Sequence, residues 1–401
     1  MGWRTVNTWT YRAGWHAALA LRPRRGLVRR LRQARRTDPS GPLLYLANGR
    51  LGDTLLAAAF TEHLRAWFGP VIAVARPEAA PVLAPQVDRF VPFDPGAAAA
   101  APHGPAALLA AARAGCRAVL GDAHLFHGGA ALLALVEALD VPRVLYDGWI
   151  DRRLQAPLRR WPRGATVVPA RDKPAGATSP EQVHVFLDLA HYHAAALRVL
   201  GGDAAAAPLP AAPALPATLR AAPGPDLPPG YVAVHASSSQ PKKDWPFERF
   251  AAALAACPDV PFALLGTDDR SLPPLPNVTD LRSRTTITQA IAVAARARAF
   301  LGVDSGLAHT AALAGVPTVV AMPQATAGLF FPYPAAFGAH VRTVRSVAHE
   351  GCAGCGGLCE HEPLWRSRRR GFPCVRAVAA DEVVAALRAA LRSPAAASSR
   401  T

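Results

Sequence analysis

The sequence has no long hydrophobic run: no uninterrupted apolar stretch reaches the ~20 residues that a membrane-spanning helix needs. It also lacks a convincing signal peptide. The apolar stretch AGWHAALAL near its start is short, contains His16, and is followed rather than preceded by the densest positive charge. These two features argue against an integral membrane protein and against a secreted one. We therefore expect a cytoplasmic protein.

Familiar signatures for nucleotide and nucleic-acid binding are missing as well. No G-x-x-x-x-G-K-[ST] loop occurs, and the segment GRLGD (49–53), after the first expected strand, has two glycines without the G-x-G-x-x-G spacing. The missing dinucleotide spacing disfavours a dehydrogenase. Nothing resembles a zinc-finger, RNA-recognition or homeodomain signature, so nucleic acid is not an expected partner.

Acidic residues are scarce, with 28 Asp and Glu against 44 Lys and Arg, which gives a net charge of +16. Such a charge attracts polyanions such as anionic lipids or phosphorylated sugars, although it is also compatible with arginine-rich solvated faces. Arginines cluster between Arg22 and Arg36, where Leu27, Val28 and Leu31 recur at helical spacing. This pattern fits an amphipathic segment on an anionic membrane, or an arm that lies on its own domain.

A chain of 401 residues is too long for one ordinary core, so two domains are the natural expectation. From residue 43 on, short apolar runs typical of buried strands alternate with helix-like segments. The alternation stops at the proline-rich residues 203–229 and restarts at YVAVHA (231–236). This pattern predicts two α/β domains with mostly parallel sheets, and ligands bind such sheets at the carboxyl ends of their strands.

The expected organisation has six parts. They are a basic extension (1–42), a Rossmann-like domain (43–202), a semi-rigid linker (203–229), a second Rossmann-like domain (230–345), a cysteine-rich module (346–376), and a helix and tail (377–401). In the first domain we expect strands at 43–48, 71–75, 89–93, 117–122 and 143–148, and helices at 53–67, 105–114 and 130–139. In the rest we expect strands at 231–236, 262–266, 299–303 and 318–322, and helices at 246–256, 285–297, 306–314 and 381–392.

The most informative stretch is GVDSGLAHTAALAGVPTVV (302–320), in which a strand ends at Asp304-Ser305-Gly306 and a helix starts at once. Asp and Ser are strong helix caps, and the free amides at such a start form an anion site suited to a diphosphate. His309 follows one turn later and could face the same ligand. The alternative is an ordinary capped turn with a half-buried histidine.

A second loop, VHASSSQPKKDWPFERF (234–250), also follows a strand of this domain. Ser237, Ser238 and Ser239 offer hydroxyls, and Lys242 and Lys243 offer compact positive charge for phosphate oxygens. Alternatively, the loop is polar with solvated lysines. Because both loops lie at carboxyl ends of strands, we expect them to converge on one ligand.

In the first domain, Asp53 stands between the first strand and its helix in LLYLANGRLGDTLLAAAF (43–60). One interpretation is a helix cap. The other is a catalytic base at the rim of a cleft, where a carboxylate could accept a proton from an acceptor hydroxyl.

In order and spacing, GRLGDTLLAAAFTEHLRAWFG, VAVHASSSQPKKDWPFERFAAALA and FLGVDSGLAHTAALAGVPTVVAMP resemble glycosyltransferase family 9, the bacterial heptosyltransferases, over roughly residues 43–392. The resemblance implies a GT-B fold, with the acceptor in the first domain and ADP-heptose in the second, facing each other across a cleft. It implies that Asp53 is the base and that Lys243 and the helix start stabilise the leaving diphosphate. The implied donor contacts are Ser237, Ser238, Lys243, Asp304, Ser305, Gly306, Leu307 and His309, with Asp268 or Asp269 facing the sugar or nucleoside.

Two features depart from the family pattern. The last core strand is followed by MPQATAGLFFPYP where the family often has a Gly-Pro-Thr-Asp-Pro-like turn, and the basic lead of 42 residues is longer than usual. The first departure bears on the identity of the donor sugar.

Four of the six cysteines cluster late, as Cys352, Cys355 and Cys359 in CAGCGGLC and then Cys374. This spacing suits one tetrahedral Zn or Fe centre, closed and structural rather than catalytic, whereas disulfides are disfavoured in a cytoplasmic protein. WRSRRRG (365–371) offers a positive surface for an anionic acceptor.

Together with these features, the resemblance implies an inverting, metal-independent glycosyltransferase that transfers heptose from ADP-heptose to a lipopolysaccharide core, another surface glycan or glycolipid, or a protein. It would act in the cytoplasm, at the inner-membrane surface. The alternative is a non-catalytic, membrane-associated scaffold of the same fold, with the metal module serving assembly.

Overall fold

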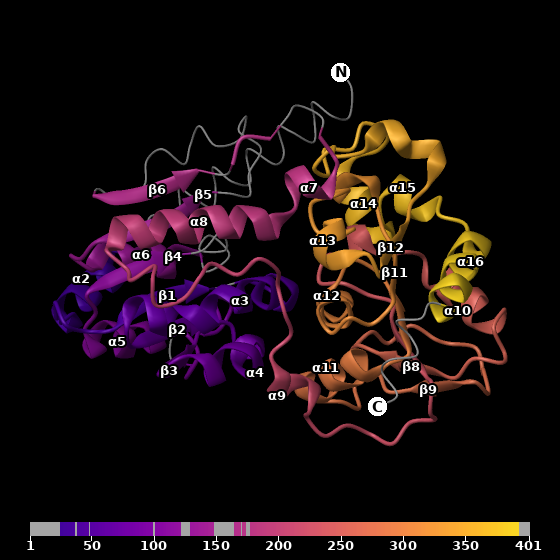
Figure 1. Ribbon diagram of the computed structural model, residues 1–401, viewed down its shortest axis with the longest axis horizontal. Coiled ribbons are helices and arrows are strands. Elements are labelled where there is room, and N and C mark those ends of the chain that lie inside the picture. The colour runs from indigo at the N-terminus through magenta and orange to yellow at the C-terminus, as the bar shows by residue number, and fades with distance from the viewer. Residues whose placement is uncertain are drawn as a thin grey trace. The chain divides into compact units, whose positions relative to one another are not determined.

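The computed structural model describes residues 25–36, 38–47, 49–98, 101–121, 129–147, 164–169, 171–173 and 177–392 (Figure 1). By their contacts these residues form two units. The N-terminal unit contains the described residues up to Asp172 together with Phe186–Pro213, and the C-terminal unit contains Lys173–Val185 and the described residues from Ala214 onward.

The N-terminal unit is built on a six-stranded parallel sheet in the order β3-β2-β1-β4-β5-β6. Its strands are β1 (Leu43–Ala47), β2 (Val71–Ala75), β3 (Arg89–Pro92), β4 (Ala118–Gly121), β5 (Arg143–Asp147) and β6 (Ala165–Pro169). Its α-helices are α2 (Arg25–Ala34), α3 (Leu51–Phe68), α4 (Ala80–Leu83), α5 (Pro105–Ala114), α6 (Gly129–Ala138) and α8 (Val185–Leu200), the last starting at the boundary of the unit. β1 and β2 are buried at every residue, which explains their continuous apolar sequences.

The C-terminal unit repeats this plan with a parallel sheet in the order β12-β11-β10-β7-β8-β9. Its strands are β7 (Val232–His235), β8 (Phe262–Leu265), β9 (Val278–Asp280), β10 (Ala299–Gly302), β11 (Thr318–Ala321) and β12 (Val341–Val344). Its longer helices are α10 (Phe247–Ala255), α11 (Ile287–Arg296), α12 (Gly306–Leu313), α14 (Leu364–Arg370) and α16 (Ala380–Leu391); the short ones are α7 (Pro180–Val183), α9 (Ala217–Arg220), α13 (Ala335–Gly338) and α15 (Pro373–Arg376). The 3₁₀ turns η5 (Pro241–Lys243), η6 (Gln324–Thr326) and η7 (Val347–Cys352) complete it.

The arginine-rich helix α2 packs its apolar face on its own unit. Val28 and Leu31 are buried in one hydrophobic core with residues of α5 and α6. Arg35 donates to the carbonyl of Ala138 at 2.8 Å, and its guanidinium lies 4.0 Å from Asp140. Of the two interpretations of this segment, the arm that lies on its own domain is therefore the one observed for Arg25–Ala34. No helix in the described part of the chain is both long and apolar enough to cross a membrane.

The proline-rich segment 203–229 is mostly without regular structure, as expected, but it contains α9. Its beginning is held by Trp67, whose indole Nε1 donates to the carbonyl of Ala207 at 2.8 Å. Its later part belongs to the C-terminal unit, where Arg220 donates to the carbonyl of Ala314. The boundary between the units therefore falls inside this segment, after Pro213, while Lys173–Val185 joins the C-terminal unit.

Candidate functional site

The expected donor loops meet in the C-terminal unit, at the point where its strand order reverses. β7 and β10 are neighbours, but the chain leaves β7 towards β8 and leaves β10 towards β11, on the other side. Ligands of open α/β sheets bind at such switch points, beyond the carboxyl ends of the strands. The loops that follow β7 and β10 carry most of the site residues expected from the sequence.

An ion pair joins these two loops. Lys243 Nζ, at the end of η5, lies 2.9 Å from Asp304 Oδ2, and the two side chains are only 13% and 3% exposed. The ammonium also lies over the ring of Phe330, 5.0 Å from its centroid, and Thr326 Oγ1 donates to Asp304 at 3.4 Å. Lys243 is thus a cation held in one orientation beside the start of α12.

Ser305 caps α12 as expected. Its backbone is extended (φ −147°, ψ 166°), and its Oγ accepts from the amide of Ala308 at 3.5 Å and lies 2.8 Å from His235 Nδ1. Burial lowers the pKa of His235 to about 4, so its imidazole is neutral near pH 7. Gly306 and Leu307 begin the helix directly after the cap, so their amides are not used by the helix and can bind an anion.

His309 lies one turn into α12 and is held by aromatic residues. Its Nδ1 is 2.7 Å from the hydroxyl of Tyr333, and its ring stacks on Phe331 with 4.4 Å between centroids. Burial, reinforced by the charge of Asp304, raises the pKa of Tyr333 well above its ordinary value, so the phenol stays protonated. Phe330, Phe331 and Tyr333 were not predicted from the sequence, although LFFPYP is a dense aromatic run.

Of the serines after β7, Ser238 forms hydrogen bonds within its own loop. Ser238 donates its hydroxyl to the carbonyl of Gln240 at 2.8 Å, and its amide donates to Asp244 Oδ1 at 2.8 Å. Burial raises the pKa of Asp244 to about 6. Ser237 is half-buried on the same loop, next to Gly266 at the end of β8.

Of the two acidic residues expected after β8, Asp268 is half-buried and Asp269 is exposed. Asp268 Oδ1 accepts from Arg270 Nε and from Arg282 NH1, each at 3.1 Å. Burial alone would raise the pKa of Asp268, but these two guanidiniums hold it below its ordinary value. Asp268 Oδ2 is buried and has no hydrogen-bond partner among the described residues, so it can accept a ligand hydroxyl. The roles of Arg270 and Arg282 were not predicted.

Asp53 belongs to the N-terminal unit and acts there as a helix cap. It is the third residue of α3, half-buried, and its Oδ2 accepts from the backbone amide of Arg50 at 3.0 Å. This bond satisfies one of the amides that have no partner within the helix.

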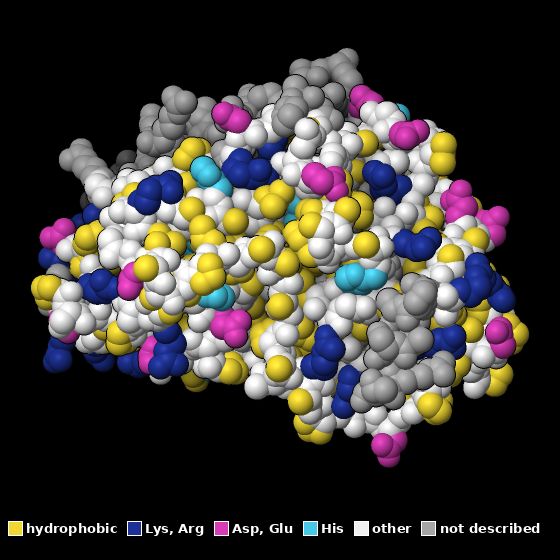
Figure 2. Space-filling model, in the orientation of Figure 1, with side chains coloured by type: hydrophobic (Ala, Val, Ile, Leu, Met, Phe, Trp, Pro, Cys, Tyr) yellow, Lys and Arg dark blue, Asp and Glu magenta, His cyan; other side chains and the backbone are white. Residues whose placement is uncertain are grey.

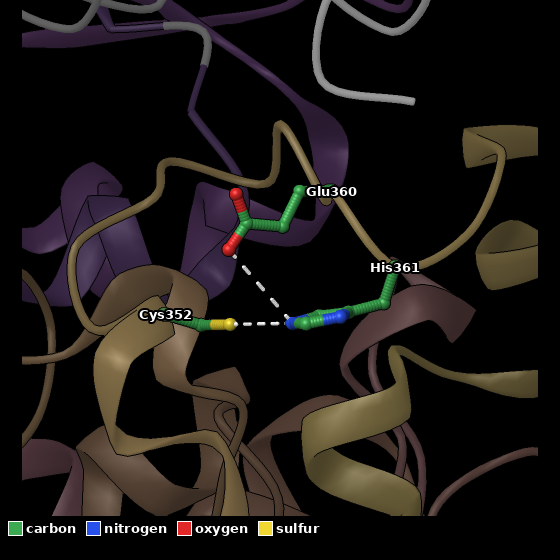
Figure 3. Close-up of side chains that lie close together, drawn as sticks. All are labelled: Cys352, Glu360 and His361. Atoms are coloured by element: carbon green, nitrogen blue, oxygen red, sulfur yellow. Dashed lines mark hydrogen bonds and ion pairs between the residues drawn. The ribbon is translucent and has the colours of Figure 1, made fainter. Parts of the chain in front are cut away.

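Three of the four clustered cysteines, Cys352, Cys355 and Cys359, directly precede Glu360 and His361 in the chain, and Cys374 follows them. Cys352 Sγ lies 3.0 Å from His361 Nε2, and Glu360 Oε1 lies 3.9 Å from the same nitrogen (Figure 3). One donor atom from each of these residues lies within 4.8 Å of the others, close enough to hold a metal ion. Cys355, Cys359 and Cys374 are not part of this group. Burial raises the pKa of the Cys374 thiol to about 11.

The sequence matches the model of one protein family, and the structure is similar to several solved structures. A model of glycosyltransferase family 9 (heptosyltransferase) matches residues 190–355, which include the loops after β7 and β10. The ADP-heptose lps heptosyltransferase II of E. coli is 15% identical with a TM-score of 0.57, covering 87% of this chain and 98% of that one. A glycosyl transferase family 9 protein from Veillonella parvula is 14% identical with a TM-score of 0.54, covering 89% and 99%.

A third solved structure is that of E. coli heptosyltransferase WaaC with ADP-2-deoxy-2-fluoro heptose, at 16% identity and a TM-score of 0.52, covering 79% of this chain and 97% of that one. No curated protein matches the sequence. The resemblance to glycosyltransferase family 9 is confirmed by the family model. The expected fold is confirmed as well: two parallel α/β sheets of six strands, the GT-B arrangement of these heptosyltransferases.

Proposed function

We propose that this heptosyltransferase-like glycosyltransferase transfers heptose from ADP-heptose, with inversion, to a lipopolysaccharide-type or other bacterial surface glycan, or to a protein. The observation that carries the proposal is the pairing of Lys243 with Asp304 beside the start of α12. The ammonium of Lys243 lies in the loop beside the free amides of α12, and both kinds of group can bind the oxygens of a diphosphate leaving group. The WaaC structure, which contains an ADP-sugar analogue, supports the donor class.

In the proposed donor complex, the diphosphate lies at the amides of Gly306 and Leu307, and Lys243 contacts its oxygens. Ser237 and Ser238 contribute hydroxyl and backbone contacts from the loop after β7. His309 faces the donor from α12, with its orientation fixed by Tyr333. The unpartnered Oδ2 of Asp268 accepts a hydroxyl of the sugar or nucleoside.

The proposed chemistry is a single displacement. The acceptor hydroxyl attacks the anomeric carbon, its proton passes to the carboxylate of Asp53, and the bond from that carbon to the ADP oxygen breaks. Lys243 and the α12 amides stabilise the negative charge that develops on ADP, a role that other enzymes give to a metal ion. Attack opposite the leaving group inverts the anomeric centre. Asp53 belongs to the N-terminal unit, so its part in this scheme is tested separately below.

The acceptor is proposed to be anionic. The chain carries a net charge of +16, and on the face shown in Figure 2 the basic side chains are spread out rather than gathered into one patch. One cluster of basic side chains lies on α14, where Arg366, Arg368, Arg369 and Arg370 are exposed. We propose that α14 binds the acceptor and that the protein works at the cytoplasmic side of the inner membrane.

The cysteine loop is proposed to hold one structural zinc or iron ion that takes no part in transfer. Its donors fit such an ion, because thiolates and imidazole are the ligands that zinc and iron sites use. The four-cysteine set predicted from the sequence, Cys352, Cys355, Cys359 and Cys374, would require Cys352 to turn from His361 towards the other three.

A thermal-shift panel of nucleoside diphosphates tests the donor. We expect ADP to raise the melting temperature more than UDP or GDP does, because the binding energy of a ligand adds to the stability of the folded state. A larger shift with UDP or GDP would assign a different donor. No shift with any nucleotide would favour the scaffold, since a non-catalytic protein has no need to bind a nucleotide. The ADP shift should shrink in Lys243→Ala and persist in Lys242→Ala, the matched control.

A further inference from the structure

A short stretch before α8, the α7 segment (178–185), lies against the aromatic loop (328–337) that follows η6. Both belong to the C-terminal unit, where α7 lies beside α13 of the loop (Figure 1). The amide of Val185 donates to the carbonyl of Leu329 at 3.0 Å, and a carboxylate of α7 accepts from the first amide of α13 at 3.2 Å. The α7 segment therefore holds the aromatic loop at both of its ends.

His184 is the buried centre of this contact. Its side chain is 0% exposed, and its Nε2 lies 3.2 Å from the carbonyl of Phe330. Its ring meets the rings of Tyr333 and Phe337 edge to face, with 4.8 and 6.1 Å between centroids. Burial lowers the pKa of His184 to about 3, so the imidazole is neutral near pH 7 and donates the hydrogen on Nε2 to this carbonyl.

Two of the residues that His184 contacts support the proposed donor contacts. The ring of Phe330 underlies the ammonium of Lys243, at 5.0 Å from its centroid. The hydroxyl of Tyr333 lies 2.7 Å from His309 Nδ1. Because a close-packed interior transmits a displacement from one side chain to the next, a change at His184 should move both supports.

The position of this hydrogen bond in the sequence sets it apart from that of another buried histidine. His193 bonds to the carbonyl of Leu189, four residues earlier in its own helix. The bond from His184 to Phe330 instead joins residues 146 positions apart. It therefore fixes the aromatic loop relative to a different segment, which a bond within one helix cannot do.

We propose that His184 is a positioning residue for the nucleoside diphosphate. Through Phe330 it fixes the ammonium of Lys243, and through Tyr333 it fixes the ring of His309. With no exposed surface, His184 acts through these residues rather than by touching the ligand. The inference deepens the proposed function and rests on it, because it takes Lys243 and His309 to be donor contacts.

The decisive experiment is calorimetric titration of the full chain with ADP, well below the melting temperature. His184→Phe keeps a ring but loses the N–H that binds the Phe330 carbonyl, so ADP affinity should fall about three- to tenfold, the scale of one buried hydrogen bond. His184→Gln offers an amide N–H about as far from the backbone as Nε2, and it should restore affinity to within about twofold of wild type. Wild-type ADP affinity in His184→Phe would overturn the proposal.

His340→Phe is the matched control. His340 Nε2 lies 2.8 Å from the carbonyl of Ala312 in the same unit, so this variant loses a comparable hydrogen bond. Its melting temperature should fall, whereas its ADP affinity should stay at the wild-type value. Equal losses of ADP affinity in His340→Phe and His184→Phe would contradict a specific role for His184 in positioning.

Phe330→Leu tests the route to Lys243, because it removes the ring and leaves the carbonyl that His184 binds. ADP affinity should fall, and adding His184→Phe should cost less than the sum of the two single losses, since both act through one ring. Additive losses would overturn this route. If His184→Phe does not fold, Phe330→Leu decides alone, and wild-type ADP affinity in it would refute the proposal.

The wild-type titration separates this inference from the proposed function. A wild-type chain that binds no nucleoside diphosphate would overturn both. A wild-type chain that binds ADP, with His184→Phe binding it equally well, would leave the proposed function standing and remove His184 from it.

Discussion

Lys243 and Asp304 lie 61 residues apart in the chain, yet their side chains meet at 2.9 Å between the loops that follow β7 and β10. The pair is almost completely buried, with 13% and 3% of the two side chains exposed. A buried charge without its partner is strongly unfavourable, so each residue fixes the position of the other. In the proposed donor complex, the diphosphate and Asp304 would share the ammonium of Lys243.

Replacing Lys243 by Ala should therefore have two effects. Nucleoside diphosphate affinity should fall by ~1.5–3 kcal/mol, the usual contribution of a hydrogen bond to a charged group. Stability should also fall by ~3–5 kcal/mol, because Asp304 is left buried and unpaired. Calorimetric titration with ADP, well below the melting temperature, measures the first effect separately from the second. Wild-type ADP affinity in the variant would remove Lys243 from the donor site.

Asp53→Asn separates catalysis from capping. The amide keeps an oxygen that can accept from the Arg50 amide, so the melting temperature should change little. A neutral amide cannot take the acceptor proton, so turnover should fall by ~10²–10⁴-fold. ADP binding should survive, since the proposed donor contacts all lie in the C-terminal unit. A variant that folds, binds ADP and transfers sugar at the wild-type rate would leave Asp53 as a cap only.

Tyr333→Phe tests whether the aromatic residues position His309. The variant keeps the ring but removes the hydroxyl that lies 2.7 Å from His309 Nδ1. Loss of one buried hydrogen bond should lower stability by ~1 kcal/mol and, if His309 faces the donor, weaken ADP binding about fivefold. Tyr231→Phe is the control, because it loses a comparable bond to the Val293 carbonyl at 2.8 Å away from the proposed contacts. Equal ADP affinity in the two variants would show that Tyr333 is structural only.

The stability of the N-terminal unit should depend on pH through His193. This imidazole is 1% exposed and stacks on Phe60 at 4.4 Å, and burial lowers its pKa from 6.5 to about 4. Between these values the unfolded chain binds a proton that the folded chain does not, so stability is lost as the pH falls from 6.5 to 4. Over that window the loss from this group approaches ~3 kcal/mol.

Variants at two histidines isolate this contribution. His193→Phe should flatten the dependence of the unfolding free energy on pH in denaturant titrations, because the proton-binding group is gone while a ring remains to pack on Phe60. His63→Phe should leave the slope as it is. His63 makes a comparable bond from Nδ1 to the carbonyl four residues earlier, at 2.9 Å, but it is only half-buried. The same slope in both variants would contradict the assignment to His193.

The sequence predicted the central strands and the edge strand β3, and it missed the other three edge strands. β1, β2 and α5 were placed correctly because burial on both faces gives continuous apolar runs, and because Gly104 and Gly115 flank the helix. β9 and β12, with the sequences VTD and VRTV, are edge strands that are only partly buried, so their composition gives little signal. β6, also at an edge, was missed for the same reason.

In the site, too, contacts between residues close in sequence could be predicted, whereas contacts between residues far apart in sequence could not. Ser305 could be predicted as a cap because capping depends on residues within one turn. The ion pair of Lys243 with Asp304 and the bond of Tyr333 with His309 join residues 61 and 24 positions apart, and no local pattern records them. Likewise, the spacing of the cysteines suggested one centre. It could not show that Cys352 faces His361 while Cys359 faces the core.

The loop that carries Lys243 is held in place from the far end of the chain. The amide of Phe372 donates to the carbonyl of Lys242 at 2.8 Å, and the indole of Trp245 donates to the carbonyl of Val378 at 3.0 Å. During synthesis, residues 372 and 378 leave the ribosome well over a hundred residues after this loop does. The nascent chain can therefore complete both sheets while the loop that carries Lys243 still lacks these two hydrogen bonds. The loop gains these two hydrogen bonds only after residues 372 and 378 have been translated.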